Sequence, residues 1–159
     1  METVVITRVI KAPIERVFEV VTDHASYSEF PGVTGSRLVR EGQPQRNGVG
    51  AVREIESAGG WFQEEVTAFD PPHRLEYRIV AARPALEHRA GSMLLSSTAD
   101  GTSVTWTSTF HLRWPVIGGL ATWLFAPLVG RAFGAMLDDV ERRIRLADSP
   151  AADSLHQPG

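Results

Sequence analysis

Arg53, Glu64 and Tyr77 are the side chains in this sequence whose types could perform acid–base chemistry together. In such a set a glutamate acts as the base, a tyrosine acts as the acid, and an arginine stabilises the negative charge of an enolate. The same groups could instead bind the polar end of an otherwise apolar ligand. An arginine beside Glu64 favours the charged carboxylate and weakens it as a base, so this pairing favours binding over catalysis.

Other residue types that often mark a metal or phosphate site lack the required spacing. The histidines do not follow any spacing used by zinc sites; they are His24, His73, His88, His111 and His156. The chain has no cysteine, and GVGAVRE at 48–54 lacks the Lys-Ser/Thr pair of a phosphate loop. Asp138 and Asp139 are adjacent on a predicted helix, about 100° apart, so they are not a proton-sharing pair. We therefore predict no metal and no cofactor.

Composition indicates one ordinary folded domain. The chain has 159 residues, of which 43% are hydrophobic and 22% are charged, with a net charge of -3. Basic residues are scattered except for RRIR at 142–145, which argues against a nucleic-acid partner. The absence of cysteine fits a reducing compartment, and METVVITRVIKAP at the start lacks the features of a signal peptide, so we expect a cytoplasmic protein.

The most apolar stretch is WPVIGGLATWLFAPLVG at 114–130, seventeen residues without a charge. A membrane-spanning helix needs roughly 20 such residues, and this stretch contains two prolines and a Gly-Gly pair. We therefore predict no transmembrane span. The stretch could pack in a core, cover an apolar cavity, or lie exposed against a partner.

Hydrophobic periodicity predicts the order strand, helix, helix, six strands, long helix. Residues 2–10 are typical of a strand, a helix follows Pro13, and 25–32 hold another turn or two of helix. Strand-length stretches separated by turn residues fill 33–114. The last helix carries an apolar stripe of Val129, Phe133, Met136, Val140 and Ile144, and Pro127 either begins it or kinks a longer one. The domain spans 1–146, and 147–159 are predicted to be a disordered tail.

Turn residues predict the strand register. Asp-Gly at 100–101 is a strong hairpin signal that would place Ala99 opposite Thr102. The covered face then pairs Leu95 with Trp106, Met93 with Ser108, Gly91 with Phe110 and Arg89 with Leu112, while His88 and His111 face outward.

Two further turns extend this register to the middle strands. The SAGG turn at 57–60 places Arg53 opposite Glu64, and DPPH at 70–73 places Val66 opposite Tyr77 and Ala68 opposite Leu75. Arg53 and Glu64 would lie on the covered face. Either water or a polar ligand group lies near them, or both side chains reach out from a sheet margin as a surface pair.

Two segments carry a family resemblance. IKAPIERVFEVVTDHASYSEFPGV at 10–33 and VTAFDPPHRLEYR at 66–78 resemble the START-like (SRPBCC) superfamily, in particular its bacterial polyketide cyclase/dehydrase-like proteins. The resemblance implies an α+β helix-grip fold, in which a bent seven-stranded antiparallel sheet wraps around a long C-terminal helix and encloses an apolar cavity. Position 30 is Phe where many relatives have Trp, and no residue here matches a catalytic motif of the cyclases.

The expected function is therefore binding of a hydrophobic small molecule, such as a lipid, an isoprenoid or quinone, or a polyketide, by a carrier or sensor. The alternative is a metal-free cyclase or dehydratase that uses Glu64 as base, Tyr77 as acid and Arg53 for enolate charge. The candidate ligand-binding residues are Arg53, Phe62, Glu64, Val66, Tyr77, Arg89, Met93, Trp106, Phe110, Phe133 and Met136.

The apolar lead-in at 116–125 is expected to cover this cavity as a lip before the last helix. Side chains left exposed there would suit transient membrane contact or a homodimer interface.

Overall fold

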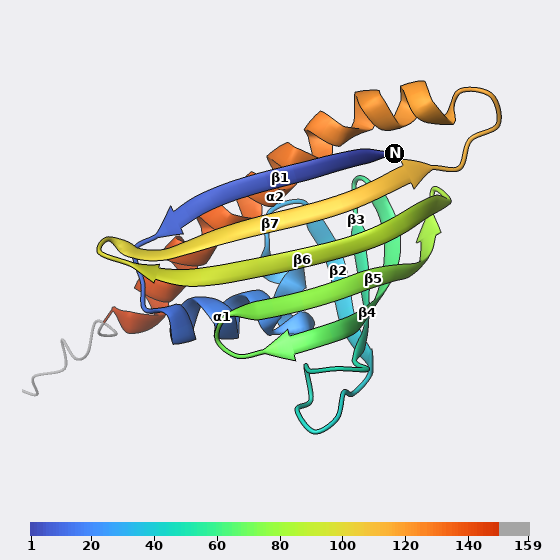
Figure 1. Ribbon diagram of the computed structural model, residues 1–159. Helices are drawn as coiled ribbons and strands as arrows, with labels where there is room; N and C mark the ends of the chain where they lie inside the picture. Colours follow the sequence, from blue (N-terminus) through green and yellow to red (C-terminus); the bar gives the residue numbers. More distant parts are fainter. Residues whose placement is uncertain (150–159) are drawn as a thin grey trace, which may run out of the picture.

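The computed structural model describes residues 1–149, which form seven strands, two α-helices and one 3₁₀ helix (Figure 1). The elements in chain order are β1 (Glu2–Ile10), α1 (Ile14–Thr22), η1 (His24–Glu29), β2 (Val33–Arg40), β3 (Val52–Ser57), β4 (Gly60–Asp70), β5 (Arg74–Arg83), β6 (Leu86–Thr98), β7 (Gly101–Leu112) and α2 (Gly118–Asp148). This order confirms the predicted one, with a 3₁₀ helix as the second helical element.

The strands form one antiparallel sheet in the order β1-β7-β6-β5-β4-β3-β2. Figure 1 shows α2 lying along β1 and β7, with α1 beside the C-terminal end of α2. The 3₁₀ helix η1 packs on β2. The predicted α+β helix-grip architecture, with seven strands and a long C-terminal helix, is confirmed.

Strand β7 shows why the sheet has one covered face. Every second residue is buried, from Thr102 through Trp106 to Leu112, which is the period expected of a strand with one face on the core. Helix α2 covers that face with a stripe that includes Leu137, Val140 and Ile144, all buried.

The β6–β7 hairpin keeps the predicted faces but shifts the predicted register by two residues. Thr98 pairs with Gly101 and Leu95 pairs with Val104, so the two-residue loop is Ala99-Asp100 instead of the predicted Asp100-Gly101. Gly101 has φ of +135°, and a Cβ there would lie 2.2 Å from the carbonyl oxygen of Ile10. This close approach requires glycine as the first residue of β7. Because the shift is an even number, the side chains stay on their predicted faces.

A β-bulge between His88 and Ala90 corrects the predictions for two residues of β6. The extra residue reverses the alternation at this point of the strand. His88 is buried on the covered face, and Arg89 is exposed outside it. Both were predicted the other way around.

A second irregularity lies between Val66 and Ala68 in β4. Val66 pairs with Tyr77 as predicted, but Ala68 pairs with Glu76 instead of Leu75. The predicted pairing of Arg53 with Glu64 is confirmed.

Helix α2 begins at Gly118, well before Pro127, which lies inside it. Of the two alternatives for Pro127, the longer helix is therefore observed. At the other end α2 reaches Asp148, so residues 147 and 148 are helical rather than part of a tail. Ser149 caps the helix, and residues 150–159 of the predicted tail lie outside the described residues.

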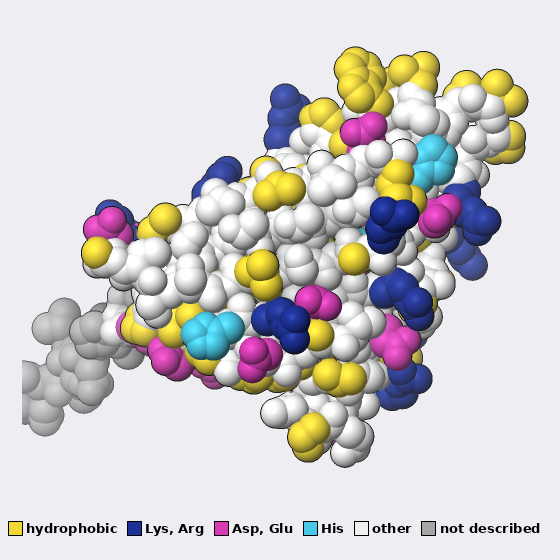
Figure 2. Space-filling model, in the orientation of Figure 1, with side chains coloured by type: hydrophobic (Ala, Val, Ile, Leu, Met, Phe, Trp, Pro, Cys, Tyr) yellow, Lys and Arg dark blue, Asp and Glu magenta, His cyan; other side chains and the backbone are white. Residues whose placement is uncertain are grey.

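The first half of α2 and the loop before it expose apolar side chains. We call this set the apolar tip; its exposed members are Trp114, Val116, Ile117, Leu120, Trp123, Leu124 and Leu128. Figure 2 shows hydrophobic side chains gathered at this protruding end of the molecule. The expectation that 116–125 cover the cavity is therefore wrong for most of the segment, and only Phe125 lines it.

Within the described residues, α2 has the length and apolar composition of a membrane-crossing helix, with a mean hydropathy of 1.4 over a window of 18 residues that is 22% buried. These are criteria of length and composition alone. The second half of the same helix packs on the core through Leu137, Val140 and Ile144.

Candidate functional site

A cavity of about 440 Å³ lies between the covered face of the sheet and α2. Alternate residues of the middle strands point into it because side chains of a strand alternate between the two faces. From the sheet it is lined by Arg53, Ile55, Phe62, Glu64, Tyr77, Ile79, Trp106, Ser108 and Phe110, and from α2 by Phe125, Leu128, Val129, Ala132, Phe133 and Met136. Most of these side chains are apolar.

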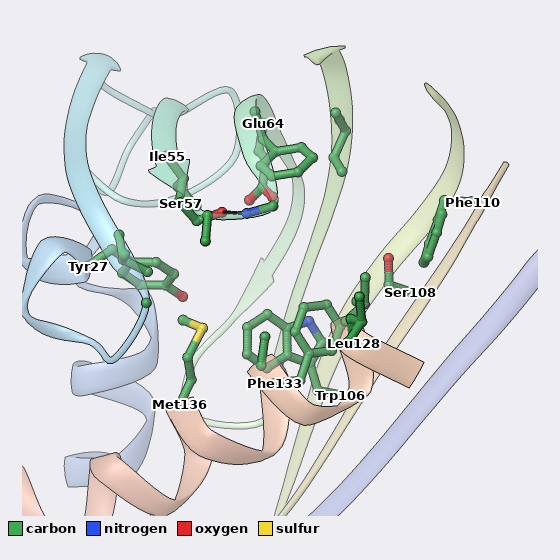
Figure 3. Close-up of a pocket in the computed structure, with 18 of the residues that line it drawn as sticks. Tyr27, Ile55, Ser57, Glu64, Trp106, Ser108, Phe110, Leu128, Phe133 and Met136 are labelled. Carbon is green, nitrogen blue, oxygen red and sulfur yellow. Dashed lines mark hydrogen bonds between the residues drawn. The ribbon is translucent and has the colours of Figure 1, made fainter. Parts of the chain in front are cut away.

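Two aromatic pairs form the wall nearest α2. Trp106 of β7 stacks on Phe133 with ring centroids 3.8 Å apart and planes within 3° of parallel. Phe110 meets Phe125 edge to face at 6.1 Å. Figure 3 shows Trp106 and Phe133 side by side, with Met136 one turn farther along the helix. The wall therefore offers flat aromatic surface to a ligand.

The end of the cavity formed by β3 and β4 carries a buried ion pair. Arg53 is 1% exposed and donates from Nε to Oε2 of Glu64 at 2.7 Å, with its Nη2 2.5 Å from the same oxygen. The guanidinium also lies over the rings of Tyr27, at 4.5 Å, and Tyr77, at 5.3 Å. Of the two alternatives for this pair, the structure shows the covered position and excludes the surface pair at a sheet margin.

His24 of η1 forms a hydrogen bond with Arg53. Its Nε2 lies 3.1 Å from the carbonyl oxygen of Asn47, which can only accept, so Nε2 carries the proton. Nδ1 then accepts a hydrogen bond from Nη1 of Arg53 at 2.8 Å. Burial and the neighbouring Arg53 lower the pKa of His24 to about 2, so the imidazole is neutral.

The charge of Arg53 is stabilised by these neighbours. Burial opposes the charge, but Glu64 and the two tyrosines outweigh it and hold the pKa of Arg53 above its ordinary value. Burial also raises the pKa of Tyr27 and of Tyr77, so both phenols keep their protons. The Tyr77 hydroxyl accepts a hydrogen bond from Nε1 of Trp106 at 2.9 Å.

The predicted site residues fall into three groups. The cavity is lined by Arg53, Phe62, Glu64, Tyr77, Trp106, Phe110, Phe133 and Met136. Val66 and Met93 are buried in the core and do not line the cavity. Arg89 is exposed and cannot reach a ligand there, because the bulge in β6 turns it outward.

Several lining residues were missing from the predicted set. Ile55 and Ile79 follow Arg53 and Tyr77 by two residues, so the strand period was a signal that could have found them. Ser108 was placed on the covered face but not taken as a site residue. Tyr27 comes from η1, and nothing in its local sequence indicates that it meets the sheet.

Among residues 1–149, no three histidine, aspartate or glutamate side chains lie together in a way that could hold a metal ion.

Solved structures with the same fold include proteins from several bacteria. A protein of Thermus thermophilus is 22% identical with a TM-score of 0.79, covering 93% of this chain and 100% of its own. The Zhui aromatase/cyclase from Streptomyces sp. R1128 is 23% identical with a TM-score of 0.75, covering 94% and 99%. A START superfamily protein from Mycobacterium smegmatis is 14% identical with a TM-score of 0.75, covering 91% and 98%. At such identities the likeness shows the fold alone.

No curated protein matches this sequence. The family model described as "Polyketide cyclase / dehydrase and lipid transport" matches residues 1–145, nearly all of the described chain. With its seven-stranded sheet gripping α2 around an apolar cavity, the chain belongs to this family, within the START-like (SRPBCC) superfamily.

Proposed function

We propose that the protein binds a hydrophobic small molecule in the cavity between the sheet and α2, as a carrier or sensor. The observation that carries the proposal is a cavity of about 440 Å³ with mostly apolar walls and one buried ion pair. Ligand pockets typically measure about 300–1,000 Å³ and combine apolar walls with a few fixed polar groups.

The side chains that line the cavity indicate which kind of ligand it would bind. Stacked Trp106 and Phe133 suit a flat ring system or an unsaturated chain. Glu64 lines the cavity, and its only hydrogen-bond partner within residues 1–149 is Arg53, bound at Oε2. Its other oxygen can accept a hydrogen bond from a ligand hydroxyl. A lipid, an isoprenoid quinol or a hydroxylated polyketide meets these requirements.

The proposal is tested with the neutral fluorescent dye N-phenyl-1-naphthylamine. Phe133→Ala removes half of the stack with Trp106, and we expect it to weaken dye binding about tenfold. Phe69→Ala is the matched control, because Phe69 packs on Phe18 and does not line the cavity. Equal affinity in the two alanine variants would show that the dye binds elsewhere.

A cyclase or dehydratase is the second candidate, because the family description includes that activity and the Zhui aromatase/cyclase shares the fold. The geometry disfavours Glu64 as its base, since Nε and Nη2 of Arg53 already contact one oxygen of the carboxylate. Turnover of an aromatic poly-β-ketone by the wild type and its loss in Glu64→Gln, with dye binding intact, would establish the enzyme instead of the carrier.

We also propose that the apolar tip makes transient contact with a membrane. No Asp or Glu occurs from Gly101 to Leu137, while Arg113 and Arg131 flank the tip. Tryptophans beside arginines favour the interface of an anionic bilayer. Leu128 belongs both to the exposed tip and to the cavity lining, so a ligand could pass directly between bilayer and cavity.

A further inference from the structure

A second polar position lies on the β7 wall, apart from the ion pair. Ser108 lines the cavity and is 3% exposed, and beside it His88 of β6 is 8% exposed. Nε2 of His88 lies 3.0 Å from Oγ of Ser108. Figure 3 shows Ser108 between Trp106 and Phe110, across the cavity from Glu64.

The contacts of His88 determine which ring nitrogen carries the proton. The backbone N–H of Ile79 donates to Nδ1 of His88 at 3.0 Å, so Nδ1 must be an unprotonated acceptor. The proton of the neutral ring is then on Nε2, which donates to Oγ of Ser108. Burial keeps the ring neutral by lowering the pKa of His88 to about 4. The ring is held in place by stacking on Tyr77 at 5.6 Å.

This arrangement leaves the Ser108 hydroxyl proton available. Oγ accepts from His88 and has no other hydrogen-bond partner within residues 1–149. Because Nε2 is already protonated, His88 cannot remove the proton of Ser108, so this serine–histidine pair does not generate a nucleophile. The remaining role for the hydroxyl is donation to an acceptor in the cavity.

We propose that Ser108 donates a hydrogen bond to a carbonyl oxygen of the bound ligand and that His88 is the positioning residue that directs it. The inference rests on the proposed binding function and narrows the ligand class. β7 and β4 are separated by two strands, and Tyr77 of the intervening β5 carries a ring that lies 5.3 Å from the Arg53 guanidinium and 5.6 Å from the His88 ring. The ligand is therefore a ketone that places its carbonyl near Ser108 and a hydroxyl near Glu64, and the stacked Trp106 and Phe133 favour a conjugated one.

The test compares 2-acetylnaphthalene with 2-ethylnaphthalene by calorimetry, since the two probes have nearly the same shape and differ in the carbonyl oxygen. Ser108→Ala should weaken the ketone about two- to tenfold relative to the hydrocarbon. Ser108→Thr, which keeps a hydroxyl, should retain the wild-type ratio. Ser57→Ala is the matched control, because Ser57 also lines the cavity but directs its hydroxyl at the carbonyl of Gly60.

His88 is tested by the same affinity ratio and by spectroscopy. His88→Phe keeps an aromatic ring beside Tyr77 but releases Ser108, so we expect weaker ketone binding with unchanged hydrocarbon binding. The infrared carbonyl stretch of bound 2-acetylnaphthalene should move to higher frequency in Ser108→Ala and in His88→Phe. Nitrogen-15 NMR of the free protein should show Nδ1 of His88 unprotonated.

Two results would overturn the inference and leave the binding function standing: equal weakening of both probes by Ser108→Ala, or a protonated Nδ1. If the wild type bound neither probe, the proposed binding function itself would fail, and the role of Ser108 would fail with it.

Discussion

Arg53 keeps its charge in a place where it has almost no contact with water. A lone buried cation is too costly to persist, and here Glu64 neutralises it, His24 accepts a hydrogen bond from it, and two tyrosine rings lie against its face. The Arg53–Glu64 pairing could be predicted because the SAGG turn sets the register of β3 and β4. His24 could not, since it reaches Arg53 from η1, twenty-nine residues away in the chain.

Neutral His24 makes stability depend on pH. Its pKa is about 2 in the folded protein against an ordinary 6.5, so below about pH 6.5 the unfolded chain binds a proton that the folded protein does not. Stability from this residue is complete above that pH and falls as the pH drops. Between about pH 7.5 and about pH 5, the wild type should lose about 2 kcal/mol more than His24→Gln in urea unfolding. If the wild type and His24→Gln lose the same free energy of unfolding over this pH range, His24 is protonated in the folded state.

The ion pair should matter more for ligand recognition than for stability. Glu64→Gln leaves the buried charge of Arg53 without its counter-ion and should cost about 3–5 kcal/mol in urea unfolding. Arg53→Met combined with Glu64→Leu removes both charges and should stay within about 2 kcal/mol of the wild type. A double variant as unstable as Glu64→Gln would instead assign the pair a structural role.

At the scale of elements, bulges and helix ends decide which residues reach the cavity. The bulge in β6 turns Arg89 out and His88 in, and the one in β4 changes the partner of Ala68. Strand periodicity predicts which face of the sheet a side chain occupies only while successive side chains alternate without a break. Nothing in the sequence of β6 indicates the extra residue of the bulge. Likewise Pro127 suggests a helix start, yet α2 begins at Gly118 and Pro127 lies inside it.

The apolar tip predicts binding to anionic vesicles. Replacing Leu120, Trp123 and Leu124 together by serine removes exposed apolar surface without touching the cavity lining. We expect the wild type to co-sediment with phosphatidylcholine vesicles that contain phosphatidylglycerol, and the triple variant to stay in solution. Leu94→Ser is the control, since Leu94 is 49% exposed on the outer face of the sheet.

In the contrary result, the wild type fails to co-sediment with these vesicles and elutes as a dimer, while the triple variant elutes as a monomer. That result would assign the apolar tip to self-association.

At the scale of the whole molecule, the sheet and α2 form two walls whose side chains do not meet everywhere, and the cavity is the space left between them. The order of elements, the covered face and eight of the lining residues could be predicted, because strand and helix periods carry that information. The volume of the cavity, the contribution of Tyr27 and the exposure of the apolar tip depend on how α2 and η1 dock. Docking is a tertiary property that no local pattern contains. The cytoplasmic location stays a prediction.

The most direct test of the central claim is native mass spectrometry of protein purified without detergent from its own host. Val129 lines the cavity, and Val129→Trp should place a bulky ring where the ligand lies, whereas Val80→Trp adds the same ring at a position that is 44% exposed. The account predicts one apolar molecule per chain in the wild type and in Val80→Trp, and none in Val129→Trp. An empty wild type, or the same bound molecule in all three proteins, would contradict it.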